Sequence, residues 1–152
     1  MLDVGCGIGD MVLYHHNCVG VDVNELNVEY CKSLGLNVRL MPFDLLPFDN
    51  DSFDSVLLDN VLEHIAEPSK ILLDIKRILR PGGILVIGVP GEKGFASDSD
   101  HKVYYDEGKL EALADKSGFR VKRYKYAPLF RSGFLSRALA QYCIYTQWQK
   151  ID

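Results

Sequence analysis

The sequence contains no long apolar run, and its few cysteines are scattered. None of its hydrophobic stretches reaches the roughly 20 residues that a helix needs to cross a bilayer, and no signal peptide precedes the first apolar segment. The four cysteines form no C-x-x-C pair, and the four histidines show no recognisable ligand spacing. These absences argue against a membrane-spanning protein, a disulfide framework and a metal site. They predict reduced thiols in a cytoplasmic protein.

Acidic residues are scarce toward the C-terminus. Residues 119–152 contain seven Lys or Arg and one Asp, although the whole chain carries a net charge of −4. A solvated basic surface explains this most simply, and an anionic partner is the alternative. No stacking platform or base-reading motif indicates nucleic acid. Internal repeats and a second-domain boundary are also absent, so residues 1–152 are expected to form a single domain.

Glycines cluster directly after the first apolar segment. Residues 2–4 (LDV) predict the end of a buried strand, and residues 5–9 (GCGIG) predict a turn that leads into a short helix beginning near Asp10. Glycines in such a turn adopt positive φ and let a ligand lie against bare backbone. The order is G-x-G-x-G, whereas nicotinamide and flavin binders carry G-x-G-x-x-G. The spacing therefore disfavours a nicotinamide cofactor.

Asp22 ends the apolar run 18–23 and is the second candidate for ligand binding. In open α/β sheets, ligands collect at the carboxyl ends of the strands, where an acid can accept both hydrogen bonds of a ribose diol. The alternative is that Asp22 or Asn24 caps the next helix. Because Asn24 is better placed for the cap, we favour the ribose role for Asp22.

Strand and helix patterns alternate along most of the chain. This order predicts an α/β sheet with helices on both faces. The helix at 25–34 is expected to bury the face that carries Leu26, Tyr30 and Leu34. The aromatic stripe within 129–142 is assigned to the core, although its basic neighbours leave open a role at a membrane surface or on an anionic acceptor. Further strands are expected at 38–40, 55–58, 84–89, 119–126 and 142–148. A turn at 79–83 is expected directly before the strand at 84–89.

The glycine loop, together with V-G-V-D at 19–22, resembles the first two motifs of class I S-adenosylmethionine-dependent methyltransferases. The segments 41–54, 61–65 (VLEHI) and 79–83 (LRPGG) resemble later motifs of that family, and the likeness covers nearly all of residues 2–119. It implies a Rossmann-like, seven-stranded, doubly wound sheet that is mostly parallel with an antiparallel last strand. Relatives usually have a helical segment before the first strand that covers the cofactor, and this lid helix is missing here.

The resemblance also implies roles for individual residues. S-adenosyl-L-methionine would be the cofactor, with the glycine loop against its methionine part, Asp22 on the ribose and Asp44 near the adenine. Phe43 or Leu45 would form an apolar wall beside the adenine, and position 59 or 60 would line the methyl-transfer pocket. We assign the cofactor contacts to Asp3, Gly5, Cys6, Gly7, Asp22, Val23, Asp44, Leu45 and Asp59.

Three residues are candidates for acid–base chemistry. Glu63 and His64 are adjacent, but a structural role is the favoured explanation for this pair. His101 follows a polar loop at 90–100 and is the candidate general base for an oxygen acceptor. The alternative is that His101 only holds this loop in place. Tyr104 is expected to shape the pocket.

These patterns predict S-adenosylmethionine-dependent methyl transfer to an O, N or C nucleophile of a small or carrier-linked acceptor. The basic C-terminal part leaves open an anionic acceptor and a peripheral contact with a membrane. No metal is implied, and the oligomeric state is left open. The alternatives are a non-catalytic adenosyl-binding or scaffolding domain of the same fold and, less favoured, a nicotinamide-dependent oxidoreductase.

Overall fold

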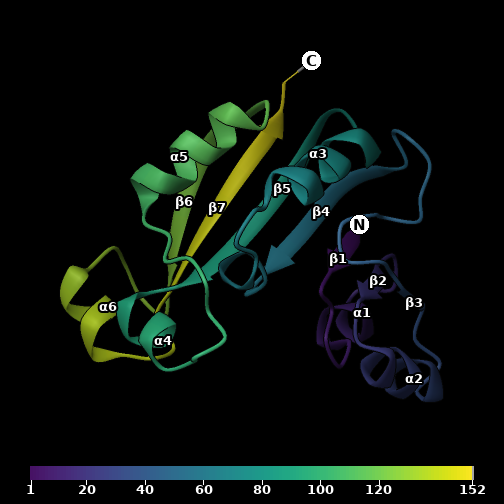
Figure 1. Cartoon of the computed structure of the whole chain (residues 1–152), viewed down its shortest axis with the longest axis horizontal. Coiled ribbons are helices and arrows are strands. Elements are labelled where there is room, and N and C mark those ends of the chain that lie inside the picture. Colours follow the sequence, from purple (N-terminus) through teal and green to yellow (C-terminus); the bar gives the residue numbers. More distant parts are fainter. Residues whose placement is uncertain (152) are drawn as a thin grey trace.

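Seven strands form one mixed sheet at the centre of the protein. In the computed structural model, which describes residues 1–151, the strands lie in the order β3-β2-β1-β4-β5-β7-β6 (Figure 1). The strands are β1 (Leu2–Val4), β2 (Val19–Asp22), β3 (Val38–Leu40), β4 (Phe53–Asp59), β5 (Leu79–Pro90), β6 (Phe119–Ala127) and β7 (Cys143–Lys150). Strands β1 to β5 pair in parallel, and β7 runs antiparallel between β5 and β6. The predicted mostly parallel sheet with an antiparallel last strand is confirmed.

The helices bury their apolar residues in two separate clusters. They are α1 (Asp10–Tyr14), α2 (Glu25–Ser33), the 3-10 helix η1 (Leu62–His64), α3 (Ser69–Ile78), α4 (Glu92–Ala96), α5 (Glu107–Lys116) and α6 (Gly133–Ala138). The larger cluster joins α3 and α5 to the central strands, and the smaller joins α1 and α2 to the strands near the N-terminus. Helices α4 and α6 pack against each other beyond the carboxyl end of β5 (Figure 1). No helix within residues 1–151 is long and apolar enough to cross a membrane.

Two predicted burial patterns are wrong. Leu26 of α2 is 73% exposed, and Tyr30 and Leu34 are also exposed, because α2 packs on the sheet through Val28 and Cys31 instead. Both faces of this helix carry apolar residues at helical spacing, so periodicity alone could not identify the inner one.

The stripe within 129–142 also differs from the prediction. Only residues 133–138 are helical, and Leu129, Phe130 and Phe134 are exposed while Tyr142 is buried. The predicted stop of the helix before 79–83 is confirmed, since α3 ends at Ile78, but the turn residues belong to β5, where Gly82 has a φ of 69° and the pairing with β4 is irregular. Strand β5 already begins at Leu79, which pairs with Phe53 of β4.

Much of the basic charge of the C-terminal part lies on β6, an edge strand. Arg120, Lys122, Arg123 and Lys125 are exposed there, next to an irregularity in the pairing with β7. Charged side chains and bulges on an edge strand discourage pairing with other chains. This placement fits the simpler explanation, a solvated basic surface.

Two side chains of α3 hold the segment that leads into β4. Asp74 accepts a hydrogen bond of 2.6 Å from the Leu46 N–H, and its other oxygen pairs with the Arg77 guanidinium at 2.7 Å. Arg77 in turn donates to the carbonyl oxygens of Leu46 and Phe48. These bonds fix the irregular segment 41–52 against the sheet, so that Phe43 is held beside the carboxyl ends of the strands.

Candidate functional site

Three glycines shape the loop between β1 and α1. Gly5, Gly7 and Gly9 have φ angles of 74°, 53° and 85°, in a region that residues with a Cβ rarely adopt. A Cβ at Gly5 would lie 2.5 Å from Cγ2 of Val61, whereas a Cβ at Gly7 would meet no atom within 4 Å. The loop is therefore tightly packed at Gly5 and open at Gly7, where a ligand can approach the backbone.

Asp22 organises this loop from the carboxyl end of β2. Its carboxylate accepts hydrogen bonds of 2.8 Å from the N–H groups of Gly7 and Asn24, and one of 3.4 Å from the Asn27 amide. The cap of α2 is Asn24, which accepts from the Leu26 N–H at 2.9 Å. Because a carboxylate has about four acceptor positions, Asp22 retains capacity for a ligand.

A cavity of about 230 Å³ opens between the loop, β2 and η1. Gly5, Asp22 and Val23 line it, as do Phe43 and Asn60. Its walls are mainly apolar, and the carboxylate of Asp22, the amide of Asn60 and the ring of His64 are the polar side chains among its lining residues. A mainly apolar hollow with a few fixed polar groups is the usual form of a cofactor site.

Of the nine assigned residues, three line this cavity: Gly5, Asp22 and Val23. Asp3, Cys6, Gly7 and Asp59 are not part of its wall, and Asp44 and Leu45 border other hollows. Asp44 faces a neighbouring hollow, where one carboxylate oxygen is 3.8 Å from the Lys70 ammonium. Leu45 is exposed and borders a different hollow beside Phe48. Of the two residues considered for the apolar wall, the structure brings Phe43 to the cavity. The local pattern could not decide this, because the segment has no regular periodicity.

Cys6 turns its side chain into the core. A Cβ at Gly20 would lie 2.7 Å from the Cys6 sulfur, so this thiol fills the space that the glycine leaves. Burial raises the pKa of the Cys6 thiol to about 12. Its backbone N–H is already bonded to the Val21 carbonyl oxygen at 3.0 Å. A cofactor could therefore contact Cys6 only through the backbone atoms of Cys6 other than its N–H.

Acidic groups gather beneath the loop at the centre of the sheet. Asp3 is buried, and burial raises the pKa of its carboxyl to about 6, with further contributions from Asp59 and Asp22. Burial also raises the pKa of Asp59, and a hydrogen bond with Tyr145 opposes this shift. A Cβ at Gly88 would overlap the Asp59 carboxylate and the Tyr145 ring. Because Gly88 has no side chain, the Asp59 carboxylate and the Tyr145 ring can meet. A cationic group bound nearby would offset the negative charge of the acidic groups gathered here.

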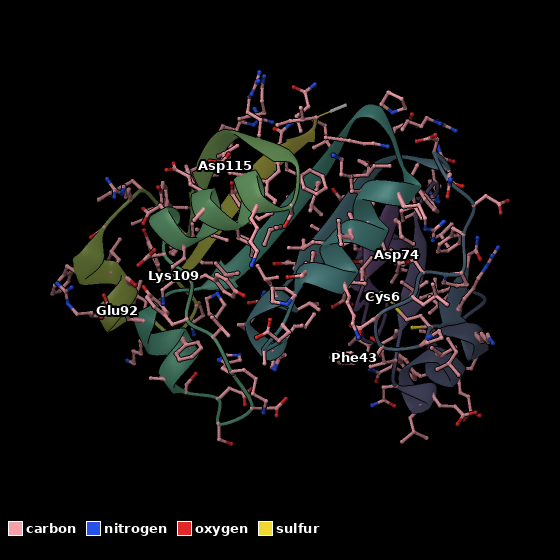
Figure 2. The ribbon with its side chains drawn as sticks, turned by 45° about the horizontal axis from the view of Figure 1, so that its top comes forward. Cys6, Phe43, Asp74, Glu92, Lys109 and Asp115 are labelled. Carbon is pink, nitrogen blue, oxygen red and sulfur yellow. The ribbon has the colours of Figure 1, made fainter. Side chains whose placement is uncertain are left out.

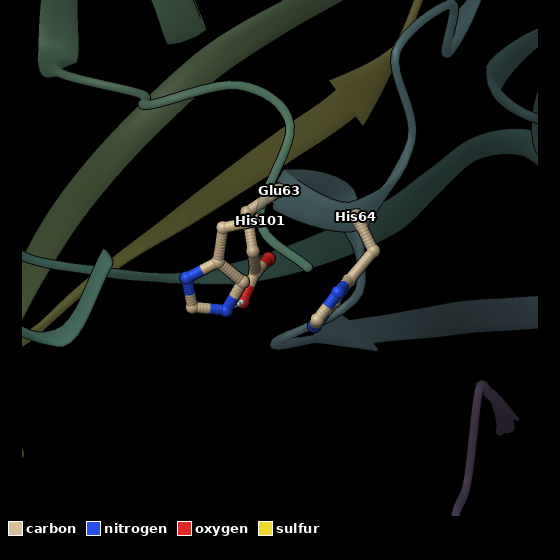
Figure 3. A group of neighbouring side chains, drawn as sticks. All are labelled: Glu63, His64 and His101. Atoms are coloured by element: carbon tan, nitrogen blue, oxygen red, sulfur yellow. Dashed lines mark ion pairs between the residues drawn. The ribbon is translucent and has the colours of Figure 1, made fainter. Parts of the chain in front are cut away.

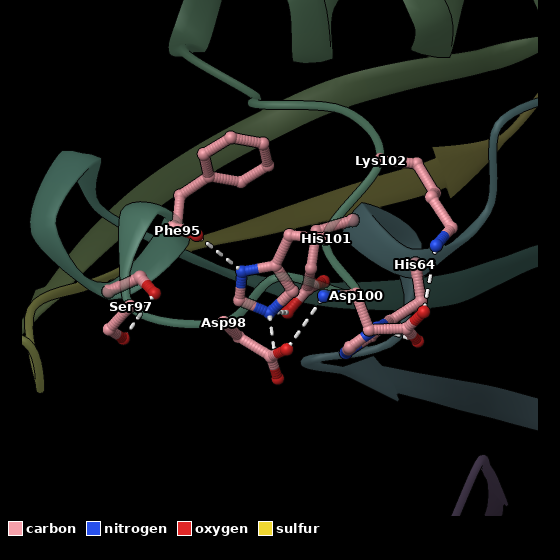
Figure 4. A network of polar contacts seen from close by, with 9 residues as sticks. His64, Phe95, Ser97, Asp98, Asp100, His101 and Lys102 are labelled. Carbon is pink, nitrogen blue, oxygen red and sulfur yellow. Dashed lines mark hydrogen bonds and ion pairs between the residues drawn. The ribbon is translucent and has the colours of Figure 1, made fainter.

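His101 lies behind the cavity rather than on its wall. Its Nδ1 is 2.8 Å from the Phe95 carbonyl oxygen, and its ring stacks on that of Phe95 (Figure 4). His64 borders the cavity, and the centroids of the two histidine rings are 4.7 Å apart. Glu63 is fully buried beside them, and burial raises the pKa of its carboxyl. The structure thus brings His101 to Glu63 and His64, from which it is far removed in the sequence.

A second, larger cavity of about 500 Å³ lies near α4 and α6. Tyr104, expected to shape a pocket, lines it together with Glu92, Ser136 and Tyr142. Figure 2 shows Glu92 toward the left of the view and Phe43 to the right of its centre, so the two cavities that these residues border are separate. The sequence analysis missed Ser136 and Tyr142, since only the pairing of β7 with β5 brings the C-terminal residues to this place.

Comparison with known proteins identifies the family. A family model described as a methyltransferase domain matches residues 2–87. The chain belongs to the class I S-adenosylmethionine-dependent methyltransferase family. It is 32% identical over 96 residues to a ubiquinone biosynthesis O-methyltransferase from Parvibaculum lavamentivorans. This match covers 57% of the present chain and 38% of that protein. It is 25% identical over 151 residues to an uncharacterised Methanocaldococcus jannaschii protein, covering 99% of this chain and 71% of the relative.

A solved structure gives the same assignment of fold. The methyltransferase subunit of a Haloferax volcanii complex with the activator Trm112 superposes with a TM-score of 0.81 at 20% identity, over 99% of this chain and 82% of that subunit. The curated relatives are longer than this chain, and its matches cover from 29% to 71% of their length.

S-adenosyl-L-methionine is the cofactor of this family, and the residues present fit it. The loop is open at Gly7, where a Cβ would meet nothing within 4 Å. Beside it, Asp22 retains acceptor capacity and Phe43 offers an apolar surface to a ring. The buried carboxyl group of Asp3 and the half-buried one of Asp59 are sources of negative charge that suits a sulfonium cation.

Proposed function

We propose that this methyltransferase transfers the methyl group of S-adenosylmethionine to an O, N or C nucleophile of a small or carrier-linked acceptor. The observation that supports this most is the cavity bounded by the glycine loop, Asp22 and Phe43. The cofactor supplies a methyl group that is already activated by its sulfonium. The protein's contribution is then to orient the two reactants and exclude water.

The residues around the cavity have distinct jobs in this proposal. Asp22 accepts hydrogen bonds from the ribose hydroxyls while it holds the loop through Gly7. Phe43 packs against the adenine, which assigns the apolar wall to it in place of Leu45. Asp3 and Asp59 stabilise the positive charge of the bound donor. Asp44 remains a proposed adenine contact and requires its segment to move from Lys70 toward the cavity.

The second cavity is the proposed acceptor site, and acids outnumber bases in its lining, where Glu92, Asp106 and Glu107 lie with Arg131. Arg131 lies 2.7 Å from the Glu107 carboxylate, and Arg137 lies 3.6 Å from that of Glu92. A hollow with paired charges, hydroxyl groups and aromatic walls supports a polar acceptor of low net charge better than a strongly anionic one.

An apolar rim borders this cavity. Leu129, Phe130 and Phe134 are exposed next to Arg131 and Arg137. Exposed aromatic residues with basic neighbours suit a membrane surface or the apolar tail of an acceptor. This rim supports an amphiphilic acceptor, presented free or at the surface of a membrane.

His101 is the proposed base if the acceptor is a hydroxyl. Since the Phe95 carbonyl can only accept, Nδ1 of His101 donates to it, and a neutral ring then has its lone pair on Nε2. His101→Ala should lower turnover while leaving binding of the cofactor product unchanged. Full activity in this variant would exclude the role.

Calorimetric titration with S-adenosylhomocysteine tests the cofactor assignment. Asp22→Asn should weaken binding about ten- to a hundredfold, since it removes a charged acceptor of hydrogen bonds. Glu29→Gln, at an exposed acid on α2, is the matched control and should bind as the wild type does. Equal affinity in all three proteins would contradict the assignment of Asp22.

Two other functions are separated by the same assay. A non-catalytic adenosyl-binding or scaffolding domain would bind S-adenosylhomocysteine and show no turnover of S-adenosylmethionine with any acceptor. The short match to the longer relatives makes this alternative worth testing. A nicotinamide-dependent oxidoreductase would bind NADH in the titration, and we expect no such binding because the loop lacks the two-residue step.

A further inference from the structure

Two short segments bring a carboxylate and two imidazoles to one point. Glu63 and His64 belong to η1, and His101 follows the loop after α4; the backbone N–H groups of Lys102 and Val103 bond to the Glu63 carbonyl oxygen and hold the segments together. One potential ligand atom of each of the three side chains lies within 4.8 Å of the other two (Figure 3). The cluster lies between the two cavities.

Glu63 has a buried oxygen with nothing to bind. The residue is 1% exposed, and its Oε2 is the only buried side-chain nitrogen or oxygen within residues 1–151 that lacks a hydrogen-bond partner. Its Oε1 is 3.8 Å from Nε2 of His101, beyond hydrogen-bond distance. Buried polar groups are almost always paired, so this carboxylate indicates a ligand that completes the site.

Both imidazoles are oriented as metal ligands usually are. Nδ1 of His101 donates to the Phe95 carbonyl oxygen at 2.8 Å, and Nδ1 of His64 is 3.2 Å from the Asp100 carboxylate (Figure 4). Such bonds fix the tautomer and leave the lone pair on Nε2. Oxygen acceptors on Nδ1 are the common outer contacts of metal-bound histidines.

We propose that Glu63, His64 and His101 form a binding site for one divalent transition-metal cation. Two nitrogen donors and one oxygen donor suit zinc and its neighbours, whereas magnesium and calcium prefer oxygen ligands alone. His64 is 33% exposed on its side chain, so one side of the site is open to a water or an acceptor atom. A cation about 2 Å from each donor would draw the three side chains closer together than they are here.

The role of the cation rests on the proposed function. His64 borders the cofactor cavity, and the Phe95 ring, which stacks on His101, also contacts the ring of Tyr104 in the second cavity. A cation between the two cavities would bind an oxygen of the acceptor and lower the pKa of its hydroxyl. His101 would then be a ligand instead of a free base, and turnover would be sensitive to chelators.

Metal binding itself is tested without any turnover. The full chain is freed of metal by a chelator and titrated with Co²⁺, whose visible absorption reports ligand type, and with Zn²⁺ by calorimetry. We expect one saturable site with nitrogen and oxygen ligation and a zinc-dependent rise in Tm. Glu63→Gln and His101→Ala should each weaken binding more than about a hundredfold. Asp100→Asn, which alters an outer contact, should cost about tenfold.

The controls separate this site from other causes. His16→Ala, at an exposed histidine on the loop after α1, should bind Co²⁺ as the wild type does. Thiolate-to-cobalt bands in the ultraviolet would reveal binding by the free cysteines and overturn the proposal, as would the absence of a saturable site or unchanged affinity in Glu63→Gln. Retained S-adenosylhomocysteine binding shows that each variant is folded. Cofactor binding without metal binding refutes only the metal site, and metal binding without cofactor binding refutes only the proposed function.

Discussion

Replacing Asp3 with Asn tests the electrostatics of the site most directly. The Asp3 carboxyl is 5% exposed, between β2 and β4 in the sheet, and its pKa is raised to about 6 by burial, then by Asp59 and Asp22. Asn has nearly the same size and cannot ionise. The substitution therefore removes a charge while it preserves the packing.

The size and sign of the effect follow from the pKa of Asp3. The value rises from 3.8 to about 6 on folding, and a shift of about two units corresponds to about 3 kcal/mol. Between these two values the folded protein binds more protons than the unfolded chain. The free energy of unfolding therefore falls as the pH rises through this window, and it stays lowered at neutral pH. Asp3→Asn should raise the stability at pH 7 by up to about 3 kcal/mol and change it little near pH 4.

Urea unfolding near pH 7 and near pH 4 measures this difference. Glu29→Gln is the control for an exposed acid and should stay within about 0.5 kcal/mol of the wild type. A less stable Asp3→Asn protein at pH 7, or a gain that is the same at both pH values, would refute the reasoning. If Asp3 stabilises the sulfonium as proposed, the more stable variant should bind S-adenosylmethionine more weakly, whereas its affinity for S-adenosylhomocysteine, whose sulfur carries no charge, should change less.

Four further variants test the packing and the apolar rim. Gly5→Ala should lower the free energy of unfolding in urea by about 2–5 kcal/mol, because its methyl group meets Val61 and the residue has a positive φ. Gly7→Ala has open space for its methyl group and should lower it by only about 1–2 kcal/mol. Equal losses in the two variants would contradict this reasoning. Gly88→Ala should destabilise the protein by about 1–3 kcal/mol, since its methyl group overlaps two side chains, and an unchanged Tm would show that they move aside freely. The double variant Phe130→Ser/Phe134→Ser should reduce co-sedimentation with anionic liposomes. If the wild-type protein does not co-sediment either, the hypothesis of a membrane contact is excluded.

The sequence by itself determined the sheet and the position of its glycine loop. Gly5, Gly7 and Gly9 have positive φ, which only glycine adopts easily, so the spacing of these glycines already predicted the turn. Asn24 was correctly predicted as the cap, because a cap is a local hydrogen bond. The buried residues of α3 recur at helical spacing and its other face is mostly polar, so its inner face is encoded in the local pattern.

Only the tertiary structure decided which side chains meet. Phe43, and not Leu45, reaches the cavity within an irregular segment whose later part is held by bonds from the distant Arg77 to the carbonyl oxygens of Leu46 and Phe48. The inner face of α2 and the exposure of Phe134 depend on what packs against them, which no local pattern records. Glu63 and His101 come together because backbone bonds join η1 to a distant loop. Local spacing fixes backbone conformation, whereas burial and the convergence of charged groups arise from contacts between distant segments.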